Sequence, residues 1–282
     1  MGLDRLDHRS TGLDHRGGSA PSGLVDGAGR LLDYWLIAYR RTWKGSAISS
    51  FVTPLLYVLA MGVLLGGFIK GDPDQLDGAT SYLAFVVPGL LAAQSMTTVF
   101  GEVTYPVLGM IKWQKTYYSM IATPLTVGDI VFAQLGFVLF RVGTISVVFL
   151  LVMAPFGLFA SVTGVVAAFF VQLLIGLAFA TPLFALTASM KDESAFPLIF
   201  RLGMIPMFLF SGAFFPISNL NPVMEALARV TPLWHGVDLT RMLLLGNLDV
   251  SLAIVHVVYL ALFAVVGWWL AVRQLTKRLV ET

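Results

Sequence analysis

Six long hydrophobic blocks, separated by short polar stretches, make up most of the chain. They cover roughly residues 47 to 69, 82 to 104, 126 to 153, 160 to 189, 195 to 216 and 251 to 272. A helix needs about 20 mostly apolar residues to cross the hydrocarbon core of a bilayer, and each block is long enough. The pattern therefore predicts an all-α integral membrane protein with six transmembrane helices.

Two polar stretches precede the first block. Residues 1 to 28 are rich in Gly, Asp, Arg and Ser and show no apolar periodicity, so we expect a disordered cytoplasmic tail. From Arg30 to Lys44, apolar residues recur at helical spacing opposite charged ones. This spacing predicts an amphipathic helix that lies at the membrane surface or packs on protein. Residues 29 to 282 are expected to form a single transmembrane domain.

The stretch from 217 to 250, between the last two blocks, is too long for a turn and still contains the apolar run Leu243 to Leu245. A pair of short helices that re-enter the membrane from outside fits this pattern better than a solvated loop. The candidate residues of this external re-entrant segment are Pro216, His235, Asp238 and Arg241.

The basic residues predict which side of the membrane each loop faces. With the tail and every second loop inside, the outer side holds only Lys70, Arg229 and Arg241. The inner side then holds Arg30, Arg40, Arg41, Lys44, Lys112, Lys115, Lys191, Arg273, Lys277 and Arg278. This excess of positive charge predicts that both termini are cytoplasmic, in a bacterial cytoplasmic (inner) membrane.

Composition narrows the function classes. Hydrophobic residues make up 57% of the chain and charged residues 12%, which is more apolar than a soluble domain of this size can hide, so membrane lipid is an expected partner. The lack of cysteine excludes disulfides, thiolate nucleophiles and cysteine-based metal sites. The net charge is +2 and the basic residues are dispersed, so no nucleic acid partner is expected.

Known catalytic motifs are absent. There is no GxSxG or HExxH, and the four histidines at 8, 15, 235 and 256 have no ligand spacing among themselves. The sequence GMIKWQKT, from Gly109 to Thr116, differs from the phosphate-binding GxxxxGK[ST] only at Gln114. That second glycine is needed for close approach to phosphate, and no strand precedes the segment. We therefore assign no catalytic residue, metal site or bound cofactor to this chain, and any ATP must be bound by a partner.

The same segment is better explained as an amphipathic helix from about Val107 to Ala122, in the cytoplasmic loop between the second and third spans. One face carries Met110, Trp113, Tyr117 and Ile121, and the opposite face Lys112, Lys115, Thr116 and Ser119. Such a helix either receives mechanical force from a soluble motor or anchors the loop in lipid. If it meets a motor, either face is a possible contact surface.

Three stretches, in this order and spacing, resemble the ABC type-2 permease family. They are WQKTYYSMIATPLTVGDIV (Trp113 to Val131), FLFSGAFFPISNL (Phe208 to Leu220) and TPLWHGVDLTRMLLLG (Thr231 to Gly246). The branch that they resemble is that of nodulation-factor (lipo-oligosaccharide) and daunorubicin-type drug exporters, from about residue 30 to the end. The resemblance implies a six-span half-transporter that forms a homodimer and binds two copies of a separate ABC ATPase, which holds ATP and Mg.

The resemblance also implies roles for particular segments. The loop helix before Thr123-Pro124-Leu125 would be the coupling helix, and the segment after Phe215-Pro216 would form the external helices. The ATPase-coupling candidates are Met110, Lys112, Trp113, Gln114, Lys115, Tyr117, Thr123 and Pro124. The expected function is outward movement of a lipid-like, glycolipid or hydrophobic drug-like substrate, whose identity the motifs do not specify.

Arg141, near the middle of the third span, is the main candidate for a substrate path, because ionisable groups at that depth are costly and tend to be functional. The alternative is a structural ion pair that holds helices together. Phe137, Phe210 and Phe214 are path candidates that ordinary packing also explains. Glu102 is placed near the cytoplasmic end of the second span, more than about 15 Å in depth from Arg141, so the two are not expected to pair.

Three rival functions remain open. An ion-driven secondary transporter should carry acids at the membrane midplane and interrupted helices in both halves. A membrane enzyme acting on lipids should show paired acids or histidines at one membrane face. His235 and Asp238 are the two candidates on the external side, and no nucleophile accompanies them. An ABC importer permease should carry a signature in a long cytoplasmic loop, and none is found.

Overall fold

The computed structural model describes residues 52, 55–57, 59–60, 76 and 78–281. The predicted tail (1 to 28), the predicted amphipathic helix (30 to 44) and most of the first hydrophobic block (47 to 69) lie outside the described residues. Within the described part, every regular element is a helix, which agrees with the predicted all-α class.

Five of the predicted spans are confirmed as helices long and apolar enough to cross a membrane. They are Tyr82–Lys112, Val127–Phe156, Val162–Ser189, Glu193–Phe210 and Val250–Val280. The first of these runs eight residues further than its hydrophobic block, and this extension changes the depth of its polar residues. The count of six spans stays a prediction, because the first block is mostly not described.

The α-helices from residue 82 onward, which include those that form these spans, follow one another along the chain with short connections. They are α2 (Tyr82–Val103), α3 (Tyr105–Lys112), α4 (Thr116–Ile121), α5 (Val127–Met153), α6 (Val162–Ser189), α7 (Phe196–Leu198), α8 (Ile205–Phe210), α9 (Pro222–Val230), α10 (Pro232–Leu245) and α11 (Val250–Val280). A π-helical turn, Ile199–Met204, joins α7 to α8. The predicted pair of short helices between the last two spans is present as α9 and α10.

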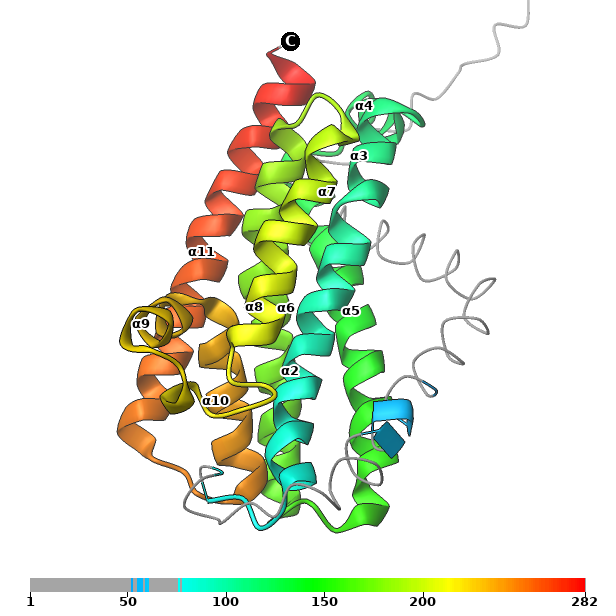
Figure 1. Ribbon diagram of the computed structural model, residues 1–282. Coiled ribbons are helices and arrows are strands. Elements are labelled where there is room, and N and C mark those ends of the chain that lie inside the picture. Colours follow the sequence, from blue (N-terminus) through cyan, green and yellow to red (C-terminus); the bar gives the residue numbers. More distant parts are fainter. Residues whose placement is uncertain (1–51, 53–54, 58, 61–75, 77, 282) are drawn as a thin grey trace, which may run out of the picture.

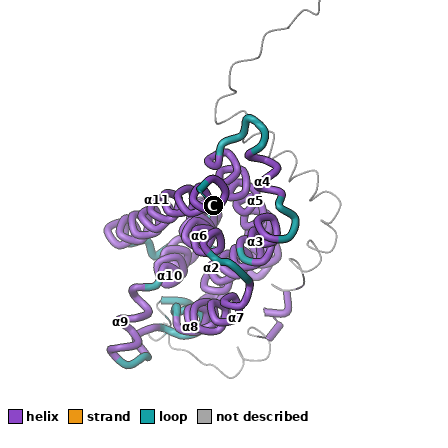
Figure 2. The backbone as a smooth tube through the Cα atoms, turned by 90° about the horizontal axis from the view of Figure 1, so that it is seen from above, coloured by secondary structure: helices purple, strands orange, loops and turns teal. Residues whose placement is uncertain are grey.

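Helix α6 lies at the centre of the bundle, with α2, α5, α10 and α11 packed around it (Figure 2). Figure 1 shows that α3, α4 and the C-terminal end of α11 lie at one end of the bundle. The tight α5–α6 connection and the end of α10 lie at the other. The Tyr118 hydroxyl donates to the carbonyl of Arg278 at 3.2 Å, which ties α4 to the end of α11.

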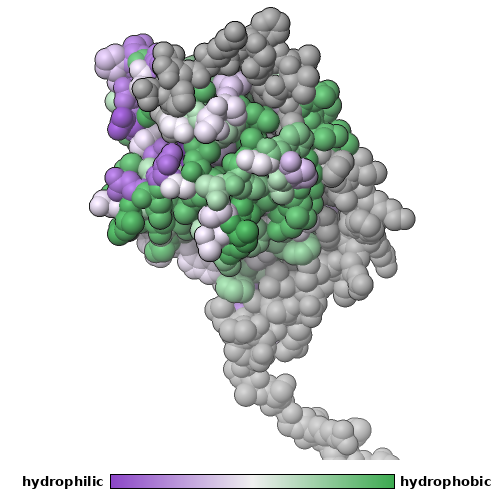
Figure 3. All heavy atoms as spheres, turned by 90° about the horizontal axis from the view of Figure 1, so that it is seen from below, coloured by the Kyte–Doolittle hydropathy of each residue, from purple (hydrophilic) through white to green (hydrophobic). Residues whose placement is uncertain are grey.

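The outer surface of the bundle is largely apolar, as a lipid-facing surface must be. Large hydrophobic side chains such as Val162, Val265 and Leu202 are 80%, 67% and 70% exposed. Figure 3 shows the described surface at the end away from the C-terminus, where hydrophilic side chains gather on the side of α9. This distribution fits a chain whose solvent is mostly lipid.

A buried chain of polar side chains ties the centre of the bundle together. Ser95 on α2 donates to the side-chain oxygen of Gln172 on α6 at 2.9 Å. The Gln172 amide donates in turn to the Thr240 hydroxyl on α10 at 3.0 Å. All three side chains are buried, so these bonds satisfy groups that lipid or core would leave without partners.

We expect Gln172→Leu to lower the free energy of unfolding by about 1 kcal/mol, because interhelical hydrogen bonds in membranes are individually modest. Ser95 and Thr240 keep backbone acceptors at Leu91 and Gly236, so neither hydroxyl is stranded. Thermal unfolding in detergent measures the change.

Gln134→Leu is the matched control. The Gln134 side-chain oxygen is buried with no hydrogen-bond partner in the described part of the chain. Replacing it should be neutral or stabilising, since it removes an unsatisfied polar group. Equal losses in the Gln172 and Gln134 variants would contradict a role for the polar chain.

Candidate functional site

The segment predicted as one coupling helix is two helices in the structure. Helix α3 ends at Lys112 and α4 begins at Thr116, so the prediction of a continuous helix from 107 to 122 is wrong. The break occurs because Lys115 takes a left-handed backbone conformation, with φ of 53°. The backbone N–H of Gln114 donates to the backbone carbonyl of Gly109 at 2.9 Å, which closes the end of α3.

The break changes which side chains face outward. Met110 and Tyr117 are buried in the core of this chain, at 4% and 1% exposure, whereas Trp113 is 55% exposed. Burial also raises the pKa of the Tyr117 phenol, because the charged form would lose its water. Of the ATPase-coupling candidates, Met110 and Tyr117 are therefore not available for contact with a motor, since both already pack against this bundle.

The remaining coupling candidates form an exposed surface at this end of the bundle. Trp113, Gln114, Lys115, Thr123 and Pro124 are exposed, and Lys112 is half-buried. We call the five exposed residues, together with the exposed Lys191 and Asp192 of the loop after α6, the coupling surface. The name denotes a candidate role that stays a prediction.

An ion pair beside this surface connects α3 to the loop after α6. The Lys112 ammonium donates to the Glu193 carboxylate at 2.8 Å, which joins the end of α3 to the start of the span Glu193–Phe210. The hydroxyl and backbone N–H of Ser194 both donate to Asp192 and hold the pKa of that carboxyl below its ordinary value. The Asp192 carboxylate therefore stays anionic at neutral pH, in the same loop that Lys112 contacts through Glu193.

The start of α5 is rigidly capped just after Thr123 and Pro124. The Thr126 hydroxyl accepts from the Asp129 backbone at 3.2 Å, and the Asp129 carboxylate accepts from the Thr126 backbone at 2.8 Å. This reciprocal capping box satisfies two amides at the helix start. A displacement of the coupling surface can therefore pass directly into α5.

Glu102 and Arg141 form an ion pair, so the prediction that they lie too far apart is wrong. Arg141 Nε on α5 lies 2.8 Å from Glu102 Oε1 on α2, and both side chains are mostly buried. The span that contains Glu102 continues through α3 to Lys112, which puts Glu102 about 15 Å inside that end. Arg141 lies about 21 Å along α5 from Val127, and its long side chain covers the difference.

The four candidates for a substrate path are not brought together. Arg141 and Phe137 are on α5, whereas Phe210 ends α8 and Phe214 follows it, and α2 lies between α5 and α8 in Figure 2. The Phe214 ring instead packs edge-on against Phe208, with 5.0 Å between ring centroids. A path lined by all four within one chain has no geometric support, and their role in transport stays a prediction.

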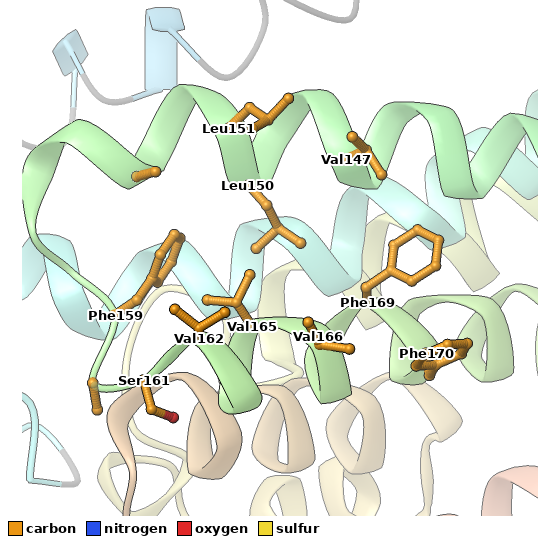
Figure 4. A pocket seen from close by; sticks show the side chains of 12 residues that line it. Val147, Leu150, Leu151, Phe159, Ser161, Val162, Val165, Val166, Phe169 and Phe170 are labelled. Carbon is orange, nitrogen blue, oxygen red and sulfur yellow. The ribbon is translucent and has the colours of Figure 1, made fainter.

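Two apolar cavities lie elsewhere, along α5 and α6. One, of about 640 Å³, is lined by apolar side chains from both helices and by Phe159 and Ser161 of their connection (Figure 4). A second, of about 530 Å³, continues along the same two helices and shares Val147 and Phe169 with the first. We call the two together the α5–α6 groove.

Three of the four re-entrant candidates, His235, Asp238 and Arg241, lie on α10. Arg241 donates to the carbonyl of Gly212 at 2.6 Å, and its guanidinium lies 3.9 Å from the centre of the Phe85 ring. Pro216 is buried just before the short turn Ile217–Asn219. A small cavity of about 240 Å³ beside them is lined by Arg229, Trp234, Asp238 and Arg241, among others.

Sequence reasoning missed the partner of His235 and Asp238. His256 on α11 contacts both, through its two ring nitrogens at 2.7 Å and 3.0 Å. The separation of 21 residues along the chain gives no ligand spacing, so only the packing of α10 against α11 reveals the cluster. The one available signal was a histidine placed six residues inside a strongly apolar helix.

The described part of the chain thus combines five candidate spans with an exposed loop-helix surface, a buried charge pair and two short helices before the last span. Residues 29–245 match the family described as ABC-2 type transporter, and the chain belongs to this family. Its relatives include Nodulation protein J of Rhizobium meliloti (strain 1021), 30% identical over 252 residues, or 87% of this chain and 94% of that protein. Nodulation protein J of Sinorhizobium fredii (strain NBRC 101917 / NGR234) is 30% identical over 88% of this chain and 94% of its own length.

A further relative is the inner membrane transport permease YadH of Escherichia coli (strain K12). It is 26% identical over 245 residues, which are 83% of this chain and 90% of that protein. The predicted resemblance to ABC type-2 permeases of the nodulation branch is thus confirmed.

Proposed function

We propose that this chain is the permease subunit of an ATP-driven exporter, in which a separate ABC ATPase acts on the coupling surface. The proposal depends mainly on the direct connection, through the backbone, between this surface and the membrane helices. Trp113, Gln114 and Lys115 are exposed between α3 and α4, and α3 is the direct continuation of the span that holds Glu102. Family membership supports an ATPase partner, which holds ATP and Mg.

The structure offers a physical route for force. A push on the α3–α4 turn moves α3, and through it α2, while the capped start of α5 moves with Thr123 and Pro124. The Glu102–Arg141 pair links α2 to α5 at depth, so the two spans would shift as a unit. In a homodimer with two ATPase subunits, such a shift would switch the shared path between inward and outward access.

The cargo that fits best is lipid-like, glycolipid or a hydrophobic drug. The α5–α6 groove is lined almost wholly by apolar side chains, against which an acyl chain or apolar ring system would be stabilised. With the coupling surface in the cytoplasm, as the distribution of Lys and Arg predicts, the groove would reach toward the outer leaflet.

An ion-driven transporter is less well supported. Glu102 lies deeper in the membrane than its sequence position indicated, as an ion-coupling acid should. However, Arg141 neutralises it at 2.8 Å, so the site has no net negative charge to attract a cation.

The experiment uses the tagged chain purified from membranes of its native host, with recovery of a co-purifying ABC ATPase and of ATP hydrolysis as readouts. The double variant Trp113→Ala/Pro124→Ala removes two exposed contacts without touching the core. If these are buried anchors of the interface, affinity for the ATPase should fall by roughly 30-fold, the effect of losing about 2 kcal/mol. Insertion and dimer formation should not change.

Val250→Ala is the matched control, because that side chain is 63% exposed at the start of α11, at the opposite end of the bundle and outside the α5–α6 groove. Lys115→Ala tests whether the charged side of the turn makes the contact instead. Full ATPase recovery in both the double and the Lys115 variants would refute the assignment. Tyr117→Ala is unsuitable as a probe, since loss of a buried ring would destabilise the fold itself.

A further inference from the structure

A buried cluster of ionisable side chains joins α10 to α11 and takes no part in the transport route proposed above. His256 on α11 is fully buried, and His235 on α10 is 6% exposed. Their Nδ1 atoms lie 2.7 Å apart. The other nitrogen of His256, Nε2, lies 3.0 Å from Asp238 Oδ2, so the contacts run from α10 to α11 and back to α10.

Aromatic rings enclose the cluster. The Tyr259 ring stacks on His235 with 3.8 Å between centroids, and Trp234 meets both imidazoles edge-on at 4.8 Å and 5.2 Å. The Tyr259 hydroxyl donates to the carbonyl of Val230, which ties the end of α9 to α11. The two imidazoles are shielded from water, whereas the Asp238 side chain is 21% exposed and lines the cavity of about 240 Å³, so the imidazoles share protons with each other and with Asp238.

The contacts limit how many protons the cluster can hold. With Asp238 ionised and both imidazoles neutral, His256 Nε2–H donates to Asp238 and His235 Nδ1–H donates to the bare Nδ1 of His256. Both contacts between α10 and α11 are then hydrogen bonds, whereas His235 Nε2 has no hydrogen to donate to the backbone carbonyl of Arg229 and gains one with the first added proton. One added proton is also accommodated, because a single N–H still lies between the two Nδ1 atoms and the added charge is balanced by Asp238.

A second added proton breaks this arrangement. Both imidazoles would be cationic, and each Nδ1 would carry a hydrogen aimed at the other across 2.7 Å. Neither nitrogen could then accept, and two like charges would repel each other in a site of low dielectric. The contact between α10 and α11 is the one that must separate.

We propose that His235, His256 and Asp238 form a proton-sensitive latch, which holds α10 against α11 while at most one proton is added and opens in acid when both imidazoles are charged. Opening would release the re-entrant pair α9 and α10 from the last span. The device would therefore sense acidity at the end of the bundle away from the coupling surface.

Other charged groups near the latch do not replace Asp238. Arg229 on α9 pairs with Glu225 at 2.7 Å and lies over the Trp234 ring. Arg241, on α10, donates to the Gly212 carbonyl. Asp249 caps the start of α11, about 10 Å along the helix from His256. Helices α6 and α8, which also pack here, contain no ionisable residue.

The test measures the distance between α9 and α11 as the pH changes. The chain has no cysteine, so spin labels can be placed at Leu227→Cys and Ile254→Cys, which are 65% and 58% exposed. Labelled chain, diluted with unlabelled chain in lipid nanodiscs, is measured by pulsed electron resonance. We expect a longer distance to appear in acid, with its ratio to the closed distance changing up to about tenfold per pH unit, the limit for one proton.

Variants separate the latch from other sensors. His235→Gln and His256→Gln, each in the labelled chain, should abolish the acid-induced distance, because two facing cations can no longer form. His8→Gln/His15→Gln should keep it. Asp238→Asn should move the transition to higher pH, because the first added proton loses its counter-charge.

A distance distribution that does not change with pH in the parent chain would overturn the proposal, as would an unchanged response in both glutamine variants. Should those variants fail to fold, an unchanged transition in Asp238→Asn overturns it instead. Neither ATP nor cargo enters the measurement, so its outcome is independent of the proposed transport function.

Discussion

Arg141→Ala is expected to lower the free energy of unfolding by about 3–5 kcal/mol, the cost of leaving one member of a buried ion pair without its partner. Arg141 Nε and Glu102 Oε1 lie 2.8 Å apart, deep between α2 and α5, where Glu102 gains little solvation once the guanidinium is removed. Thermal unfolding of purified chain in detergent measures the loss, and ATP-dependent export measures its effect on transport.

The double variant Glu102→Ala/Arg141→Ala separates a structural pair from a substrate contact. If the pair is structural, removing both charges should cost clearly less than removing either, because no isolated charge remains. Reversal of the pair, Glu102→Arg/Arg141→Glu, should recover part of the stability. If stability and assembly recover while export does not, Arg141 also acts in the path. Additive losses in the double variant would show that the two side chains do not stabilise each other.

Gly267→Ala is expected to destabilise the bundle by about 1–3 kcal/mol, the usual cost of overpacking a close interface. A Cβ at this position on α11 would lie 2.3 Å from Thr181 Oγ1 and 2.6 Å from the backbone nitrogen of Pro182 on α6. Neither neighbour can move cheaply, because the first is a short branched side chain and the second is backbone. Small residues at such positions let helices in membranes approach closely.

Gly203→Ala provides the comparison, since a Cβ there would meet nothing within 4 Å. Both substitutions reduce the flexibility of the unfolded chain by a similar amount, so the difference between them isolates the contact between α6 and α11. The same unfolding assay applies to both variants. A Gly267 variant as stable as the Gly203 variant would mean that the two helices separate readily.

The coupling segment shows how far helical periodicity can be trusted. Met110, Trp113 and Tyr117 share one face of an uninterrupted helix, and that face was expected to act as a unit. The left-handed backbone at Lys115 turns the chain between Trp113 and Tyr117, so one ring points outward and the other into the core. Lysine has no strong preference for that conformation, and no local pattern marked the break.

The depth of Glu102 shows a similar limit. Hydropathy placed the end of the second span near residue 104, just before Tyr105 and Pro106. In the structure the helix resumes at Tyr105, with Pro106 in its first turn, and continues to Lys112. The break at Thr104 is local and does not end the candidate span, so Glu102 lies well inside that span and reaches Arg141.

The sequence by itself determined the helical class, the positions of five spans, the two short helices before the last span and the family. Each of these depends on apolar length or on motifs that can be read along the chain, because a helix in lipid satisfies its own backbone locally. Only the tertiary structure decided the pairing of Glu102 with Arg141, the burial of Met110 and Tyr117, and the meeting of His235, Asp238 and His256. Those contacts depend on the relative depth and rotation of packed helices, which side-chain packing sets and no local pattern records.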